Sequence, residues 1–104
     1  MSIKLHLALE NAVEAQVIFR CPGCKHAHSL RVKGPGPCWV WNGSMETPTF
    51  IPSILVQAFS DKSVRCHSFV TDGKIQFLVD CTHELRGQMV DLPNWEEGVS
   101  YANQ

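Results

Sequence analysis

Hydrophobic and polar positions along this chain follow the spacing of strands, not of helices. Between residues 3 and 10, apolar residues at the odd positions alternate with mostly polar residues at the even positions. This period of two is expected of a half-buried strand. Further strands are predicted in AQVIFR (15–20), SLRV (29–32), CWVWN (38–42), SILVQAF (53–59), CHSFVT (66–71), KIQFLVDC (74–81) and a short piece of 85–95. The pattern predicts a mainly β protein with a small, single-domain antiparallel β-sheet fold.

Asp72 and Gly73 separate two of these strands and indicate a tight hairpin. A two-residue type I′ turn needs positive φ at both central residues, which Asp-Gly tolerates well. In this register Val70 faces Ile75. One face then carries Cys66, Ser68, Val70, Ile75, Phe77, Val79 and Cys81. The opposite face carries His67, Phe69, Leu78 and Asp80.

The chain contains five cysteines, two of them in CPGC between predicted strands. Disulfide frameworks belong mostly to secreted chains with even cysteine counts, so this odd number favours metal ligation. Zinc commonly takes two ligands from C-x₂-C on a tight turn, and Pro22 and Gly23 suit such a turn. We therefore predict a zinc knuckle in which Cys21 and Cys24 bind Zn²⁺. Cys38 stands alone and is expected to be a buried structural thiol.

The second pair of zinc ligands is expected at the ends of the hairpin. Four residues compete for two positions: Cys66, His67, Cys81 and His83. The register favours Cys66 with His83, leaving Cys81 and His67 in reserve. His67 can also be a hydrogen-bonded structural histidine, and Cys81 a small buried hydrophobic residue.

Two further histidines follow the CPGC motif, at His26 and His28. Both are expected to be solvent-facing loop residues, although His26 is close enough in sequence to supplement the knuckle.

Chain length and net charge limit the number of domains and the kinds of partner to be expected. The 104 residues fit one zinc-binding β domain at 1–95 with a polar C-terminal tail at 96–104. A formal charge of −1 argues against a broad nucleic-acid or membrane surface. No apolar run approaches the roughly 20 residues that span a bilayer, and the start lacks the features of a signal peptide. We therefore expect a cytoplasmic protein of the host cell.

The motifs CPGC, CWVWNG, PTFIPSIL, RCHSFVTDGKIQFLVDCTH and GQMVDLP together resemble a family of small uncharacterised phage and prophage proteins. The resemblance covers roughly residues 19–95, and Arg86 stands where relatives often have alanine. Members are often labelled ammonia monooxygenase by automatic annotation. The resemblance implies a zinc-binding, mainly β domain encoded by a phage or an integrated element. A membrane copper monooxygenase needs spanning helices, which this chain lacks.

The leading functional expectation is a binding module with a structural zinc ion. Trp39, Trp41, Asn42 and Gln88 are candidates for its binding surface, although the tryptophans also suit a core. The resemblance points to a host or phage protein as partner. Basic residues around CPGC leave nucleic acid as a weaker possibility.

The alternative is a zinc-dependent hydrolase or deaminase-like enzyme with an open metal vertex. His67, Asp80 and His83 can then act as general acid or base near the ion. The chain lacks HExxH and the order of motifs found in zinc deaminases, which favours a structural ion.

Overall fold

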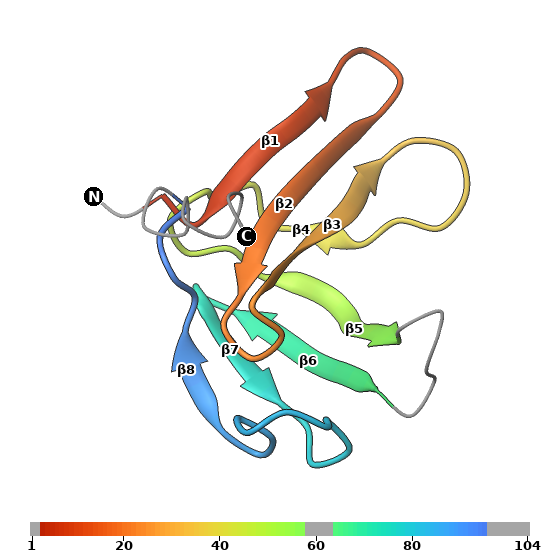
Figure 1. Cartoon of the computed structure of the whole chain (residues 1–104). Coiled ribbons are helices and arrows are strands. Elements are labelled where there is room, and N and C mark those ends of the chain that lie inside the picture. Colours follow the sequence, from red (N-terminus) through yellow and green to blue (C-terminus); the bar gives the residue numbers. More distant parts are fainter. Residues whose placement is uncertain (1–2, 58–63, 96–104) are drawn as a thin grey trace.

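The computed structural model describes residues 3–57 and 64–95 and contains two antiparallel β-sheets (Figure 1). Its strands are β1 (Leu5–Glu10), β2 (Ala15–Cys21), β3 (His26–Lys33), β4 (Val40–Trp41), β5 (Phe50–Gln57), β6 (Arg65–Thr71), β7 (Lys74–Phe77) and β8 (Met89–Asp91). The prediction of a mainly β, antiparallel fold is confirmed. No helix in the described part of the chain is long and apolar enough to cross a membrane.

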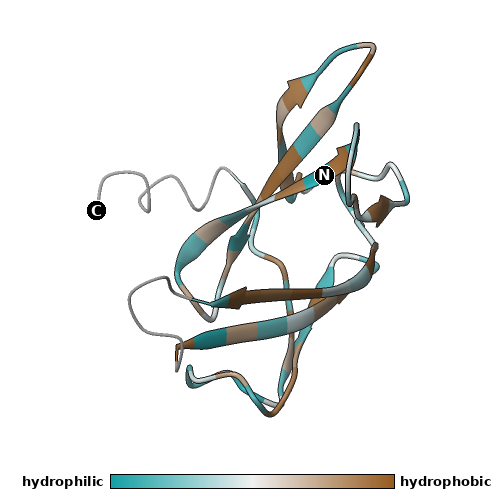
Figure 2. Ribbon diagram, turned by 90° about the vertical axis from the view of Figure 1, so that its right-hand side faces the viewer, coloured by the Kyte–Doolittle hydropathy of each residue, from teal (hydrophilic) through white to brown (hydrophobic). Residues whose placement is uncertain are grey.

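A three-stranded sheet has the order β1-β2-β3, and a five-stranded sheet has the order β4-β5-β6-β7-β8. Neighbouring strands pair in sequence order, so each sheet is a meander. Hydrophobic and hydrophilic residues alternate along several strands (Figure 2). This alternation explains why each sheet has one buried face.

The core lies between the two sheets. Val17, Phe19 and Leu30 from the first sheet and Val70 and Phe77 from the second are almost completely buried. The rings of Phe19 and Phe50 stack across the interface at 6.3 Å between centroids. Buried aromatic pairs of this kind add to the stabilisation that burial of apolar area provides.

The hairpin predicted at Asp72 and Gly73 is present, with φ of 50° and 79°. Val70 pairs with Ile75, as expected from the two-residue turn. The second strand is shorter than predicted because β7 ends at Phe77. Beyond it the chain turns, and the amide of Cys81 donates to the carbonyl of Leu78.

The turn after β7 leaves the side chain of Val79 exposed. Val79 was expected on one face with Val70 and Phe77, which are buried, whereas the Val79 side chain is 82% exposed. The polar tail predicted at 96–104 and the last two residues of the predicted strand 53–59 lie outside the described residues.

Candidate active site and candidate metal centre

Three polar side chains form a hydrogen-bonded row on the outer face of the five-stranded sheet. Oγ of Ser53 lies 3.1 Å from Nε2 of His67, and Nδ1 of His67 lies 3.2 Å from Oδ2 of Asp80. An ionised carboxylate only accepts hydrogen bonds, so Nδ1 carries a proton, and in the neutral imidazole Nε2 then accepts from the Ser53 hydroxyl. This is the arrangement of a serine, histidine and aspartate triad.

The pairing of β5 with β6 brings the serine to the histidine. Leu55 pairs with His67, and Ser53 lies two residues earlier on β5. The register shifts between Phe50 and Ile54: four steps on β5, from 50 to 54, match two on β6, from 70 to 68. Ser53 lies within this irregular stretch, which also holds the cis peptide bond preceding Pro52. Bulged strands commonly redirect a side chain beside an active site.

Asp80 lies in the turn after β7 and also receives a hydrogen bond from Arg65, at 3.3 Å. Desolvation raises the pKa of this carboxyl, but hydrogen bonds from His67 and Arg65 outweigh it, so the pKa of Asp80 lies below its usual range. Asp80 is therefore ionised at neutral pH. The side chains of His67 and Asp80 are 26% and 38% exposed, so the row is open to a substrate.

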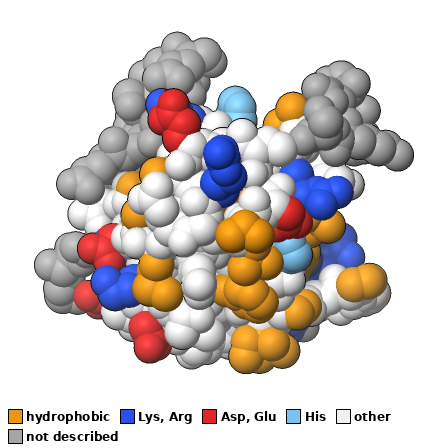
Figure 3. Space-filling model, turned by 90° about the horizontal axis from the view of Figure 1, so that it is seen from below, with side chains coloured by type: hydrophobic (Ala, Val, Ile, Leu, Met, Phe, Trp, Pro, Cys, Tyr) orange, Lys and Arg blue, Asp and Glu red, His pale blue; other side chains and the backbone are white. Residues whose placement is uncertain are grey.

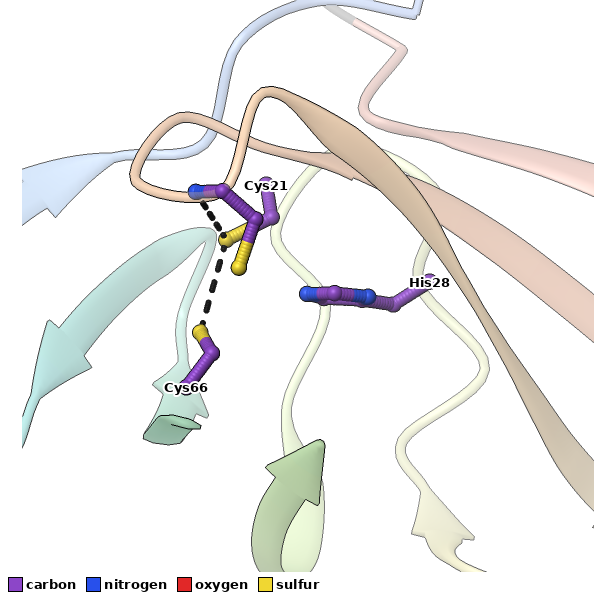
Figure 4. A group of neighbouring side chains, drawn as sticks. Cys21, His28 and Cys66 are labelled. Atoms are coloured by element: carbon purple, nitrogen blue, oxygen red, sulfur yellow. Dashed lines mark hydrogen bonds between the residues drawn. The ribbon is translucent and has the colours of Figure 1, made fainter. Parts of the chain in front are cut away.

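A second group of reactive side chains lies where the turn between β2 and β3 meets β6. One donor atom each of Cys21, Cys24, His28 and Cys66 lies within 4.8 Å of the others. The sulfurs of Cys21 and Cys66 and the ring of His28 point toward one another (Figure 4). Three sulfurs and one imidazole are a donor set that tetrahedral zinc accepts. The described cysteines are all free thiols.

The sulfur of Cys21 is the acceptor at the centre of this group. It receives the backbone N–H of Cys24 at 3.4 Å and lies 3.7 Å from the sulfur of Cys66. Hydrogen bonds from Cys24 and Cys66 lower the pKa of the Cys21 thiol. The hydrogen bond to Cys21 raises the pKa of Cys66, and the bond from Cys24 to Cys21 raises the pKa of Cys24 to about 12. The turn thus favours a thiolate at Cys21, the form that binds metals.

His28 was expected to face solvent, and this prediction is wrong. It lies on β3, which begins at His26, and it is only 8% exposed. Its Nε2 is buried without a hydrogen-bond partner among the described residues. Buried polar atoms are rarely left unpaired, so a cation at the cysteines would satisfy this nitrogen. His26 is exposed, as expected.

The four residues predicted as candidate ligands on the hairpin lie in two separate groups of side chains. Cys66, Cys81 and His83 also have donor atoms within 4.8 Å of one another, so Cys66 belongs to both groups. His83 lies against Gly23 of the CPGC turn, where a Cβ atom would collide with its ring. His67, a reserve ligand, instead lies in the row with Ser53 and Asp80.

Cys81, the other reserve ligand, already has protein partners. Its sulfur accepts the backbone N–H of His67 at 3.2 Å and donates to the His67 carbonyl at 3.1 Å. The Cys81 thiol therefore makes the two backbone hydrogen bonds with His67 that a residue of a neighbouring strand would otherwise make. This contact connects the buried sulfur cluster with the polar row on the other face.

Residues 2–78 match the family model of BubE, described as a bacterial ubiquitination-like system serine protease. The chain belongs to the BubE family. No curated protein and no solved structure matches the chain. The match to the BubE family includes Ser53 and His67 and ends two residues before Asp80.

From the sequence, two of the three residues in the row of this BubE family member were considered for catalysis only as acid or base groups beside a zinc ion. His67 and Asp80 were expected on one face of the hairpin and were considered for acid or base catalysis. Ser53 was missed because PTFIPSIL contains no G-x-S-x-G nucleophile motif. Its proximity to His67 depends on the irregular pairing of β5; Pro52 indicates an irregular strand there, but not that Ser53 meets His67.

The four residues predicted as a binding surface differ in exposure. Trp39 and Trp41 are partly buried and pack against the core. The indole N–H of Trp39 donates to the carbonyl of Ser53 at 3.3 Å, which fixes the backbone of that serine. Asn42 and Gln88 are exposed and donate to the carbonyls of Thr47 and Glu84.

Proposed function

We propose that this protein is a serine protease with Ser53 as nucleophile, His67 as general base and Asp80 as the residue that orients His67. The observation that carries the proposal is the 3.1 Å contact between Oγ of Ser53 and Nε2 of His67. The hydrogen bond from His67 to Asp80 and the membership of the BubE family support it. A binding module would need no such row of side chains.

The proposed reaction follows from the directions of these hydrogen bonds. Oγ of Ser53 attacks the carbonyl carbon of a peptide bond while Nε2 of His67 takes the hydroxyl proton. Asp80 stabilises the resulting imidazolium through Nδ1–H. The proton then passes from Nε2 to the leaving amine as the C–N bond breaks. Water activated by His67 hydrolyses the acyl-enzyme and restores the serine.

We further propose that Cys21, Cys24, His28 and Cys66 bind a structural zinc ion. Four protein donors fill a tetrahedral coordination sphere and leave no vertex for water. In this set His28 takes the position first considered for His83. The ion would hold the CPGC turn of the first sheet to β6 of the second, and would supply folding energy where the two sheets meet.

Covalent labelling by a fluorophosphonate probe tests the protease proposal. The probe reacts with serines activated by a neighbouring base, so wild-type protein is expected to be labelled and Ser53→Ala is not. Ser29→Ala is the matched control, because Ser29 is an exposed serine on β3. Labelling that persists in Ser53→Ala, or is absent from folded wild-type protein, would refute the proposal.

The zinc-dependent hydrolase remains a second candidate on one specific observation. A cavity of about 670 Å³ is lined by Cys24, His28 and Cys66, and also by His83. Water in this cavity can reach a metal ion held by three of these residues, the arrangement of catalytic zinc sites. The electronic spectrum of the cobalt-substituted protein separates the two candidates, since an exogenous anion such as azide changes it only where a coordination position is open.

The proposed protease function gives the partner expected from the sequence a definite role, that of substrate. A host or phage protein, the expected partner, becomes the substrate of the protease, and nucleic acid has no place in this reaction. Origin in a phage or prophage and residence in the cytoplasm stay predictions.

A further inference from the structure

The strand that carries Ser53 has an incompletely covered edge. β4 pairs with β5 only at Phe50 and Ile51, because β4 contains just Val40 and Trp41 (Figure 1). Among the residues that the structure describes, no strand pairs with the later part of β5 on the side away from β6. Within this part of the chain, the edge is therefore not covered by a strand at Leu55, whereas at Ser53 the carbonyl accepts from the Trp39 indole.

The direction of the backbone groups on this edge follows from the ladders. The carbonyl of His67 accepts from the amide of Leu78, so the backbone of His67 faces the β7 side of β6. Backbone groups alternate in direction along an antiparallel strand. Cys66 and Ser68 therefore hydrogen-bond to β5. Their partners are Val56 and Ile54.

Leu55 lies between these two hydrogen-bonded positions. Its N–H and C=O consequently point away from β6, toward the open edge. The carbonyl of Ser53 points the same way and accepts from the Trp39 indole. An unpaired N–H and C=O two residues from a nucleophile are the groups with which a sheet edge captures an extended peptide.

The surface around this edge is apolar. Leu55 is 52% exposed, Ile51 58%, Val40 65% and Phe69 43%. Viewed from the side of β5 to β8, hydrophobic side chains form a band next to a histidine that is flanked by an acidic and a basic side chain (Figure 3). Large exposed apolar residues gathered beside a candidate active site favour a ligand with apolar side chains.

We propose that the substrate is an extended peptide segment that pairs as an additional strand with Leu55 on β5 and places apolar side chains on this band. The inference rests on the proposed protease function, because Ser53 must attack the bound segment. Strand addition also explains selectivity: main-chain hydrogen bonds hold the segment, and alternate side chains contact the apolar surface. A folded helix or loop cannot pair in this way, so the cleaved segment must be extended or unfolded.

Wild-type protein is tested with acetyl-Ala-Ala-Ala-Leu p-nitroanilide and its singly N-methylated analogues. N-methylation removes one N–H, and only every second N–H of a paired strand faces its partner. We expect kcat/KM to fall about tenfold at alternate positions, the value of one hydrogen bond, and to change little at the positions between. Replacement of the substrate's leucine by aspartate is expected to lower kcat/KM similarly.

Leu55→Pro removes the N–H from the open edge, a position where a strand tolerates proline. This variant is expected to lower kcat/KM about tenfold for every peptide in the series, because a substrate carbonyl loses its donor. The alternating pattern is expected to persist, because the carbonyl of residue 55 still accepts from the substrate, and Leu55→Ala, which retains both groups, is the matched control. If Leu55→Pro does not fold, the N-methylated peptides measured with wild-type protein still show whether the substrate pairs as a strand.

p-Nitrophenyl acetate separates this inference from the function on which it rests. The ester is too small to pair with a strand and needs only the reactive serine. Ester hydrolysis that does not depend on Ser53 would refute the protease proposal. Hydrolysis that depends on Ser53, combined with no cleavage of the tetrapeptide or with equal losses at all methylated positions, would overturn the strand-addition inference alone.

Discussion

Ser53 and His67 lie on adjacent strands, and their side chains meet at 3.1 Å between Oγ and Nε2. They lie fourteen positions apart in the sequence. The contact exists because β5 bulges before Ile54, which brings the serine next to the histidine opposite Leu55. Asp80 completes the row from a turn after the following strand.

Asp80→Asn is expected to leave the protein folded and to lower its turnover by about 10²- to 10⁴-fold, because an amide does not favour the Nδ1–H tautomer of His67. Steady-state hydrolysis of p-nitrophenyl acetate measures the change. Asp91→Asn is the control, since Asp91 is an exposed carboxylate bonded to Lys74. Equal rates for Asp80→Asn and wild-type protein would remove Asp80 from the triad.

His28→Ala is expected to release zinc to a chromophoric chelator at a concentration at which wild-type protein retains one ion per chain. The reason is that His28 would supply the fourth donor of the cluster. His26→Ala is the matched control, because His26 lies on the same strand but is exposed. Elemental analysis of protein never exposed to chelator gives the starting content, and finding no zinc there would contradict the metal proposal.

Cys21→Ser is expected to unfold the domain or to lower its Tm by roughly 15 °C or more, since metal-binding energy is folding energy in small sites. Differential scanning calorimetry measures this shift. Cys38→Ser provides the comparison: Cys38 belongs to neither sulfur group and donates to the carbonyls of Gly34 and Gly36. A Tm that Cys21→Ser leaves unchanged would show that the ion is dispensable for folding.

Gly23→Ala is expected to destabilise the protein by about 1–3 kcal/mol, because a Cβ atom at this position overlaps the His83 ring. In a His83→Ala background the same substitution should cost much less. Urea denaturation of the two single variants and the double variant gives the coupling energy. Additive effects would mean that His83 does not press on the CPGC turn.

Several structural features could be predicted from local sequence. Alternating hydrophobicity indicates strands, and Asp72-Gly73 specifies a hairpin, because both depend on short-range geometry. The CPGC motif identifies Cys21 and Cys24 as candidate ligands by residue type and spacing alone. His67 and Asp80 were predicted on one face of the hairpin; Asp80 lies in the turn beyond the ladder, where its carboxylate hydrogen-bonds His67.

Other features depend on how distant strands pair. His28 is buried at the cysteines because β3 packs that face inward, whereas its sequence neighbourhood resembles a polar loop. Ser53 meets His67 because of a shift in register between β5 and β6; Pro52 indicates an irregular strand at this point, but not which residue the shift brings to His67. The composition of the polar row and of the sulfur cluster was decided by contacts between strands far apart in sequence, because register and burial are properties of the assembled sheets.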